Sequence, residues 1–349
     1  MDKQSSSKSL HVLIIGAAHY RSREWGMSIQ WALPLLPELL PPGIMSRLQS
    51  ASVDRHYVFP KSGNSMPVYD ASSGELLKYG KEFRTFRTLE GDPTVTAHFL
   101  YNTTYTGTLI VAADGANSDV RQAVFPSGQG ASQQVSYGGV KMHVKYNNAE
   151  IALFLRKFLS PIQAIGVHPK GYWLWLSVQD VPEPDKPEDW TFQLQWTWKI
   201  GVETTELNLE KLKAEAESSF AEPFKTAWTK IPSDTRVPAN RITTWPPRAI
   251  PADIFQGKVA LLGDAAHPMT FHRGQGMNHG IADAVKLVQV LEKVNASETT
   301  LAEAMEEYEN EMIRRAGEEV KISKMNTEMM HDWEKFLGSP FMQMGGNKN

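Results

Sequence analysis

The stretch GKVALLGDAAHPMTFHRGQGMNHGIADA, at residues 257–284, decides the fold class of this chain. It opens with an apolar run, residues 259–262, that is typical of a strand buried on both faces of a parallel sheet. After a glycine-rich loop, apolar residues recur at helical spacing from residue 281 to residue 291. Gly274-Gln275-Gly276 is therefore predicted to lie at a helix N-terminus, where backbone N–H groups and the helix dipole stabilise an anion or an electron-rich carbonyl.

The order of residues in this stretch resembles the second flavin fingerprint of the class A flavoprotein monooxygenases, the aromatic-hydroxylase family. The family pattern reads GDAAH, a proline, GQG, an asparagine, a glycine and DA. A second stretch, GTLIVAADGANSDVR at residues 107–121, resembles the family's DG fingerprint, in which a strand ends at Asp-Gly and a serine and an arginine follow. Two such motifs in the family's order, about a domain apart, indicate membership of this superfamily.

The resemblance implies FAD as the cofactor, NAD(P)H as the co-substrate and a set of residues that hold the flavin. Asp264 would hold the ribityl chain, and the helix start at residues 274–276 would face the pyrimidine edge of the ring. Asp114 and Arg121 would serve the flavin and the approach of the nicotinamide, whereas His267 and Pro268 would shape the loop. No catalytic residue is assigned. The predicted cofactor-binding residues are Gly16, Asp114, Gly115, Arg121, Gly263, Asp264, Gly274, Gln275, Gly276 and Asn278.

The N-terminal part of the chain departs from the family pattern. The family opens with a strand, a GxGxxG turn into a helix, and a second strand that ends in an acidic residue holding the ribose. Here residues 10–18 supply the strand and one glycine, Gly16, and residues 19–26 then resemble family sequence from beyond the second strand. A βαβ unit takes roughly thirty residues, so most of the GxGxxG unit and the ribose acid are predicted to be missing. Glu24, the nearest carboxylate, matches another part of the family and is not given the ribose role.

Two further departures concern the rest of the flavin site. A second gap is predicted between Leu77 and Lys78, where segments that relatives keep apart are fused. In addition, Phe271-His272-Arg273 stands where many relatives have a proline near the ring. The chain thus keeps the residues for the ring and the ribityl chain and lacks much of the part that holds the adenylate.

Composition excludes several other classes of protein. With 349 residues, 41% hydrophobic and 21% charged, the chain has the composition of a globular protein. A net charge of −3 without a basic run gives no sign of nucleic-acid binding. The absence of cysteine excludes disulfides, thiolate nucleophiles and Cys-based metal sites. The apolar run near the N-terminus could pass for a signal peptide, but it is short and ends at Gly16, which favours a first strand and a cytoplasmic protein. Four prolines interrupt residues 28–45, so no integral membrane segment is expected there.

The middle of the chain changes to strand patterns, which predicts a second domain. Strands are expected at 139–146, 171–179 and 191–199, and in the last of these apolar and polar residues alternate. The fold class is therefore α/β plus antiparallel β: a truncated Rossmann-like FAD-binding domain with an inserted β-sheet substrate domain and C-terminal helices. Core packing is favoured for Trp173, Trp175, Trp196 and Trp198, although an aromatic face toward a substrate stays open. The expected domains are 10–134 with 240–330 for FAD, 135–239 for the substrate, and a tail at 331–349.

Other chemistries find no support in the sequence. His267, His272 and His279 lie within a dozen residues but fit no zinc template, and no G-x-S-x-G nucleophile turn is present. The expected function is an FAD-dependent monooxygenase that uses NAD(P)H and O2 to oxygenate a small organic molecule, aromatic or from secondary metabolism. Two alternatives stay open: a cofactor-free descendant that binds a ligand or guides a non-redox cyclisation, and an inactive product of mis-splicing or truncation. The substrate and the oligomeric state are left open.

Overall fold

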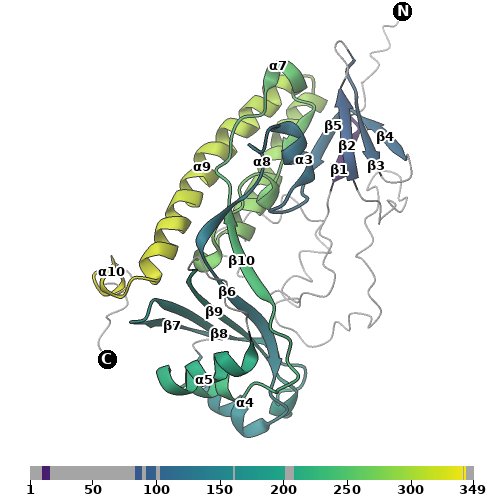
Figure 1. Ribbon diagram of the computed structural model, residues 1–349. Helices are drawn as coiled ribbons and strands as arrows, with labels where there is room; N and C mark the ends of the chain where they lie inside the picture. Colours follow the sequence, from purple (N-terminus) through teal and green to yellow (C-terminus); the bar gives the residue numbers. More distant parts are fainter. Residues whose placement is uncertain are drawn as a thin grey trace, which may run out of the picture.

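The computed structural model describes residues 10–15, 83–88, 92–99, 103–159, 162–200, 208–340 and 342. Three sheets and the helices that cover them make up this part of the chain (Figure 1). Gly16, Glu24 and the two predicted gaps, after Ala18 and after Leu77, lie outside the described residues. What the sequence indicates for these positions stays a prediction.

A parallel sheet of three strands joins segments that are far apart in the sequence. Its order is β1 (Val12–Ile15), β5 (Leu109–Ala112) and β11 (Val259–Leu261), and both pairs are parallel. All side chains of β5 and β11 are buried, as continuous apolar runs predict. Ala112 faces β1 on one side and β11 on the other at the last paired position of each, so the three strands end at one edge. The prediction that the first apolar run is a strand of this fold is confirmed.

A small antiparallel sheet that the sequence analysis did not predict lies beside the parallel one. Its order is β2 (Phe83–Thr88), β3 (Val95–Phe99) and β4 (Thr104–Gly107). Buried side chains of β2 and β3 belong to the same apolar core as β5 and β11. The two sheets and the helices around them therefore share one hydrophobic core.

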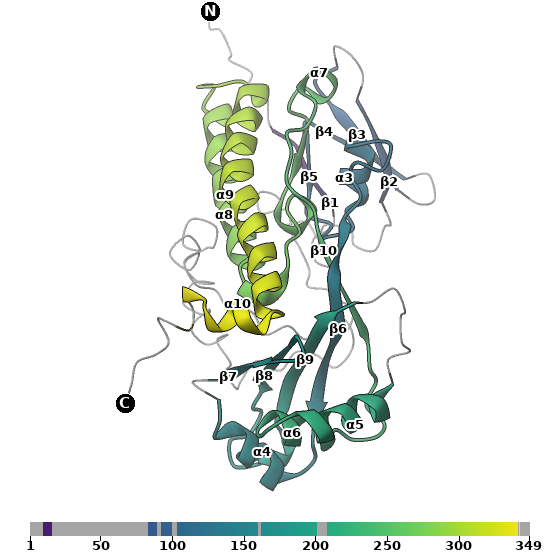
Figure 2. The same ribbon diagram turned by 60° about the vertical axis from the view of Figure 1, so that its left-hand side comes forward.

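The middle of the chain forms an antiparallel sheet of five strands in the order β10-β6-β9-β8-β7. The strands are β6 (Gln133–Lys145), β7 (Gln163–His168), β8 (Tyr172–Asp180), β9 (Thr191–Lys199) and β10 (Ala239–Thr244). The predicted strands are confirmed within β6, β8 and β9, whereas β7 and β10 were not predicted. The long β6 and its neighbour β10 run from the parallel sheet down into this second sheet (Figure 2). The domain boundaries at 135 and 239 stay a prediction.

Helices cover one face of the five-stranded sheet and one side of the parallel sheet (Figures 1 and 2). Those of the first group are α4 (Ala149–Arg156), α5 (Leu209–Ser219) and α6 (Phe224–Thr229), which share a core with β6, β8 and β9. Those of the second group are α8 (Gly276–Asn295) and α9 (Leu301–Met330), which lie side by side. The remaining α-helices of the described residues are α3 (Asp119–Val124), α7 (Ala252–Phe255) and α10 (Trp333–Leu337). Short 3-10 helices lie at Pro187–Asp189, Gly263–Ala265 and Phe271–Arg273. Helix α9 starts with a capping box, in which the side chains of Thr300 and Glu303 each accept a hydrogen bond from the backbone N–H of the other residue.

Strand β9 is buried on both faces, although its sequence alternates between apolar and polar residues. Its apolar side chains pack toward α4, α5 and α6. Gln193, Gln195 and Thr197, on the other face, are also at least nine-tenths buried. Polar side chains are thus enclosed on the side of the sheet that faces the rest of the molecule.

Glu309 of α9 provides a test of the core around the parallel sheet. Its carboxylate accepts a hydrogen bond from the backbone N–H of Ile250 at 3.1 Å, and burial raises its pKa from 4.5 to about 7. Because the pKa of Glu309 is higher in the folded state than in the unfolded state, ionisation of this carboxyl disfavours folding. The free energy of unfolding is therefore highest below pH 4.5 and falls as the pH rises through 7. Glu309→Gln keeps the acceptor without the charge, and we expect it to raise the free energy of unfolding at pH 8 by roughly 1–2 kcal/mol.

Urea denaturation at pH 5 and at pH 8 checks this expectation. At pH 5 the variant and the parent should unfold at nearly the same urea concentration, because Glu309 is protonated in the folded parent. Glu298→Gln, at an exposed position, is the matched control and should change neither midpoint. An equal effect of Glu309→Gln at both pH values would contradict the assignment of the charge as its cause.

Candidate functional site

Two loops that the sequence singled out leave the same edge of the parallel sheet. Asp114 follows β5 and Asp264 follows β11, and these strands are neighbours with Ala112 paired to Leu261. Gly263 has a φ of +60°, which glycine adopts without strain. A Cβ added to Gly263 would lie 3.8 Å from the Cα of Gly280 in α8, so the loop and the helix meet backbone to backbone. The topology therefore brings both fingerprints to one place.

Asp264 lies beside the start of α8. A Cβ added to Gly276 would come within 3.6 Å of Asp264 Oδ1. Solvent reaches the Asp264 side chain, yet protein surrounds it closely enough that desolvation raises its pKa, against the opposing effects of His267 and Arg121. The predicted ribityl-holding residue and the predicted GQG helix start are thus adjacent.

The N-terminus of α8 is suited to a group with partial negative charge. Its N-cap residue, Gln275, makes no side-chain capping bond to the first turn, and that turn contains no acidic residue. Gly274, just before it, has a φ of +65°, and a Cβ there would meet open space. The dipole of a helix of 20 residues adds to the effect at this end. Asn278 is buried and donates to the carbonyl of Gly274 at 3.3 Å, which holds the turn together.

The loop after β5 is shaped by Asp114. Its Oδ2 accepts hydrogen bonds from the backbone N–H groups of Asp119 at 2.8 Å and Val120 at 3.2 Å. Its Oδ1 is buried and has no hydrogen-bond partner among the residues that the structure describes. Gly115 has a φ of +80° with open space where a Cβ would stand. An unpaired acceptor next to open backbone fits a hydroxyl-bearing ligand.

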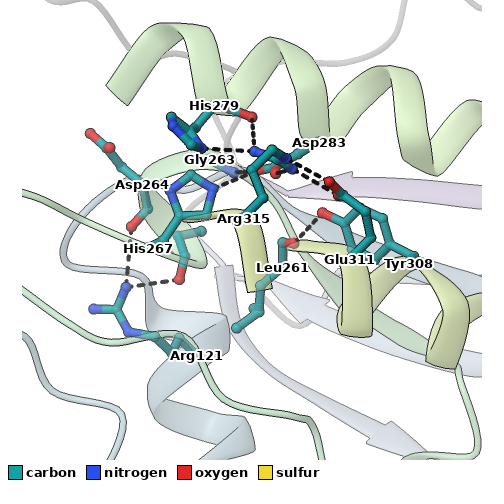
Figure 3. A network of polar contacts seen from close by, with 11 residues as sticks. Arg121, Leu261, Gly263, Asp264, His267, His279, Asp283, Tyr308, Glu311 and Arg315 are labelled. Carbon is teal, nitrogen blue, oxygen red and sulfur yellow. Dashed lines mark hydrogen bonds and ion pairs between the residues drawn. The ribbon is translucent and has the colours of Figure 1, made fainter. Parts of the chain in front are cut away.

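Arg121 is fully buried and binds backbone carbonyls of both loops. Figure 3 shows its contacts with the loop after β11. It donates to Ala116 at 2.6 Å, to Gly130 at 2.7 Å and to Ala265 at 2.8 Å. A fourth contact, at 3.3 Å, reaches the carbonyl of Asp264. These contacts fix the loop after β11 against the loop after β5. The contact of Arg121 with flavin or nicotinamide stays a prediction.

A buried ionic network holds the Gly-Asp loop from the other side (Figure 3). Asp283 Oδ2 accepts from the backbone N–H of Gly263 at 2.8 Å and from His267 Nε2 at 2.6 Å, and Oδ1 pairs with Arg315 at 2.7 Å. Burial alone would lower the pKa of His267, but Asp283 raises it overall. Burial alone would raise the pKa of Asp283, but His267 and Arg315 lower it overall. The network therefore contains charged groups that compensate one another.

Arg315 extends this network along α9. It donates to Glu311 at 2.7 Å and to His279 Nδ1 at 2.9 Å, and burial with the charge of Arg315 lowers the pKa of His279 to about 4. Tyr308 of the same helix donates to the carbonyl of Leu261 at 2.7 Å. No sequence motif includes α9, so sequence reasoning did not identify Tyr308, Glu311 or Arg315 as residues of this site. Asp283 was within reach, since it is the aspartate of the matched DA pair.

The tryptophans of the five-stranded sheet separate onto its two faces. Trp196 packs in the core with α5 and α6, its ring 5.2 Å from that of Trp228. Trp173, on the opposite face, lies 4.6 Å from His272 and 5.9 Å from Phe271, ring centre to ring centre. This second face is therefore directed toward the loop that precedes Gly274, where the flavin ring is expected.

The described part of the chain shows neither a cluster of metal ligands nor a helix that could span a membrane. None of its groups of histidine, aspartate and glutamate side chains has the arrangement of a metal site. Its helices include none with the length and apolar character needed to cross a bilayer.

Comparison with known proteins identifies relatives along most of the sequence. The family described as FAD binding domain matches residues 72–323. The FAD-dependent monooxygenase cctM of Talaromyces islandicus is 34% identical, over 94% of this chain and 88% of its own. The FAD-dependent monooxygenase phnB of Penicillium herquei is 33% identical, over 93% and 86%.

Solved structures of low sequence identity share the fold. The 2,6-dihydroxypyridine-3-hydroxylase of Arthrobacter nicotinovorans gives a TM-score of 0.59 at 14% identity, over 92% of this chain and 93% of its own. Klebsiella pneumoniae HpxO, in complex with FAD and uric acid, gives 0.57 at 22% identity, over 76% and 62%.

The alignment with cctM spans 364 positions, more than the 349 residues of this chain. The relative thus has residues inside the aligned part that this chain lacks. That these residues fall at the two predicted gaps stays a prediction. The match of the FAD binding domain family and the identity to the two fungal enzymes establish the relationship. This chain belongs to the class A FAD-dependent monooxygenase family.

Proposed function

We propose that this protein is an FAD-dependent monooxygenase that takes electrons from NAD(P)H and transfers one oxygen atom of O2 to a small aromatic molecule of secondary metabolism. The observation that carries the proposal is the pairing of β5 with β11, which sets Asp114 and Asp264 at one sheet edge beside the start of α8. Relatives of 33–34% sequence identity are named as FAD-dependent monooxygenases, and one of the solved structures that share the fold holds FAD and uric acid.

The residues present fit a flavin. Asp264 can accept hydrogen bonds from ribityl hydroxyls, and the first turn of α8 can stabilise negative charge at the pyrimidine edge of the ring. Bound FAD would supply the electron transfer and the activation of O2. The buried face of the five-stranded sheet that carries Trp173 would exclude water from the ring. Arg121 and the Asp283 network hold in place the two loops that would surround it.

Absorption spectroscopy of the purified protein tests the proposal. We expect a yellow protein, or one that becomes yellow when FAD is added, with consumption of O2 that depends on NADH or NADPH. FAD should be lost easily on gel filtration, because hydrogen bonds to charged groups contribute about 1.5–3 kcal/mol each and the adenylate part of the site is predicted to be incomplete. A folded protein that stays colourless in excess FAD would overturn the proposal. Thermal stabilisation by an aromatic ligand in that colourless protein would then support the cofactor-free alternative.

Asp264→Ala is expected to weaken FAD binding by about 10- to 100-fold, because the substitution removes charged hydrogen-bond acceptors at the ribityl position. The unfolding transition of the apoprotein should change little, since the side chain is reached by solvent. Quenching of FAD fluorescence measures the dissociation constant. Asp253→Ala, at an exposed position of α7, is the control and should bind FAD as the parent does. Equal affinities of the two variants for FAD would show that Asp264 does not contribute to FAD binding.

A further inference from the structure

A chain of buried hydrogen bonds joins the five-stranded sheet, the loop before Gly274 and the end of α9. Thr197 Oγ1 of β9 lies 3.2 Å from His272 Nε2 and 2.9 Å from His331 Nε2. On the other side of its ring, His272 Nδ1 lies 2.8 Å from Thr327 Oγ1 of α9. Each of these four side chains is more than nine-tenths buried. The three elements that meet here come from positions up to 134 residues apart.

The proton positions on His331 follow from one carbonyl. His331 Nδ1 lies 2.7 Å from the backbone carbonyl of Thr327, which can only accept, so Nδ1 carries a proton. Burial lowers the pKa of His331, against the smaller opposing effects of hydrogen bonds to the backbone of Thr327 and Thr197, so the ring is neutral near pH 7 and its Nε2 has no proton. Nε2 must then accept a hydrogen bond, and the partner that donates to it is the hydroxyl of Thr197.

The protons on His272 follow from those on His331. A hydroxyl has one proton, and the proton of Thr197 is already given to His331, so His272 Nε2 must donate to Thr197 Oγ1. Burial and the neighbouring His331 lower the pKa of His272 well below its usual value, so its Nδ1 has no proton and accepts from Thr327. The Thr327 hydroxyl therefore gives its single proton to His272, in competition with two other acceptors in reach, the hydroxyl of Thr270 at 2.7 Å and the carbonyl of Ser323 at 3.0 Å. Every hydrogen bond from Thr327 to His331 then points the same way.

His272 is also a packing partner of the loop in which it stands. Its ring stacks on that of Phe271, with the ring centres 4.5 Å apart and an angle of 20° between the planes. The ring of Trp173 lies edge-on to it, with the ring centres 4.6 Å apart. Gly274 follows two residues later with a positive φ, and α8 begins at Gly276. A ring fixed by a hydrogen bond on each nitrogen therefore determines where Phe271 and the start of α8 lie relative to β8 and β9.

We propose that His272, held as the Nε2–H tautomer between Thr327 and Thr197, is a positioning residue that fixes the loop before Gly274 against the five-stranded sheet. It acts through Phe271 and the backbone that leads to Gly274, and it needs no contact with flavin or substrate itself. Loss of the Thr197 hydroxyl would leave a buried N–H of His272 without an acceptor, and the loop before Gly274 would no longer be held in one position relative to the sheet. The positioning role rests on the proposed function, whereas the proton arrangement does not.

Nuclear magnetic resonance of protein labelled with nitrogen-15 at histidine tests the proton arrangement without flavin or activity. Long-range proton–nitrogen correlations distinguish the two neutral tautomers, and the variants His272→Gln and His331→Gln identify the two sets of signals. We expect His331 as the Nδ1–H tautomer and His272 as the Nε2–H tautomer at pH 7.5. The opposite tautomer on His272, or a charged ring at either position, would overturn the proposal.

A matched pair of substitutions at Thr197 tests the positioning role. Thr197→Val keeps the shape and removes the hydroxyl, so we expect altered visible circular dichroism of bound FAD and a fall in kcat/KM of about tenfold. Thr197→Ser keeps the hydroxyl and should preserve the tautomers and restore both readouts to within about twofold of the parent. Failure of serine to restore them, or an unchanged flavin spectrum in the valine variant, would overturn the role.

The two proposals fail in different ways. If the protein binds no FAD, the proposed function fails, but the tautomers of His272 and His331 still confirm or overturn the hydrogen-bond chain. If FAD binds and turnover occurs while the tautomers differ from those expected, only the role of His272 fails. Should Thr197→Val not fold, the parent spectrum together with Thr197→Ser decides the question, because a serine that shifts the tautomers would contradict it.

Discussion

Replacement of Asp283 by alanine is expected to lower the free energy of unfolding by about 3–5 kcal/mol, the range for loss of one partner of a buried ion pair. The carboxylate is fully buried and receives hydrogen bonds from His267 at 2.6 Å and from the backbone of Gly263 at 2.8 Å. Without it, the guanidinium of Arg315 and a protonated or unpaired His267 would stay enclosed. Because Gly263 anchors the loop that carries Asp264, the variant should also lose FAD.

Urea denaturation of the apoprotein and FAD titration measure the two effects. Glu307→Ala is the matched control, because Glu307 also pairs with two cations, Lys286 at 2.6 Å and Lys293 at 2.9 Å, but at an exposed position. Solvent screens such a pair, so the control should leave both measurements nearly unchanged.

A second variant tests the cause of the instability. Adding Arg315→Met to Asp283→Ala removes the charge that is left unpaired and should recover part of the lost stability. If the double variant is as unstable as the sum of the two single variants, Asp283 and Arg315 do not act as a pair.

Replacement of Arg121 by alanine is expected to lower the free energy of unfolding by about 3 kcal/mol, from carbonyls left without donors and from the cavity that remains. The side chain is fully buried, and its donors reach Ala116, Gly130 and Ala265. Arg121→Lys should recover only part of the loss, because an ammonium cannot reproduce the planar set of donors.

The apoprotein separates a structural role of Arg121 from contact with the cofactor. A loss of stability without FAD present supports the structural role that the hydrogen bonds indicate. An apoprotein of unchanged stability that binds FAD weakly would instead support the contact with flavin or nicotinamide that the resemblance implies.

Local patterns in the sequence were enough to locate the elements that form the site. Residues 259–262 are uniformly apolar because their strand is covered on both faces, and Thr300 with Glu303 encode a helix start that needs no distant partner. The small sheet β2-β3-β4 was not predicted, because its strands have only four to six residues and because β2 and β4 lack a clear alternation of buried and exposed positions. Strand β9 was predicted from its alternation of apolar and polar residues, but that pattern indicates a polar face exposed to solvent, whereas the polar side chains are buried.

By itself the sequence determined the family and the strand, loop and helix order around Asp264, because these follow from periodicity and from motifs whose residues lie close together in the chain. The pairing of β5 with β11, which brings the two fingerprints together, came only from the tertiary structure. Only the tertiary structure decided what holds that site together. Arg121 bonds to residues up to 144 positions away, Asp283 meets Arg315 across 32 positions, and Thr197 reaches His331 across 134. Such contacts depend on which surfaces come together when the core packs, and no local pattern of residues records that choice.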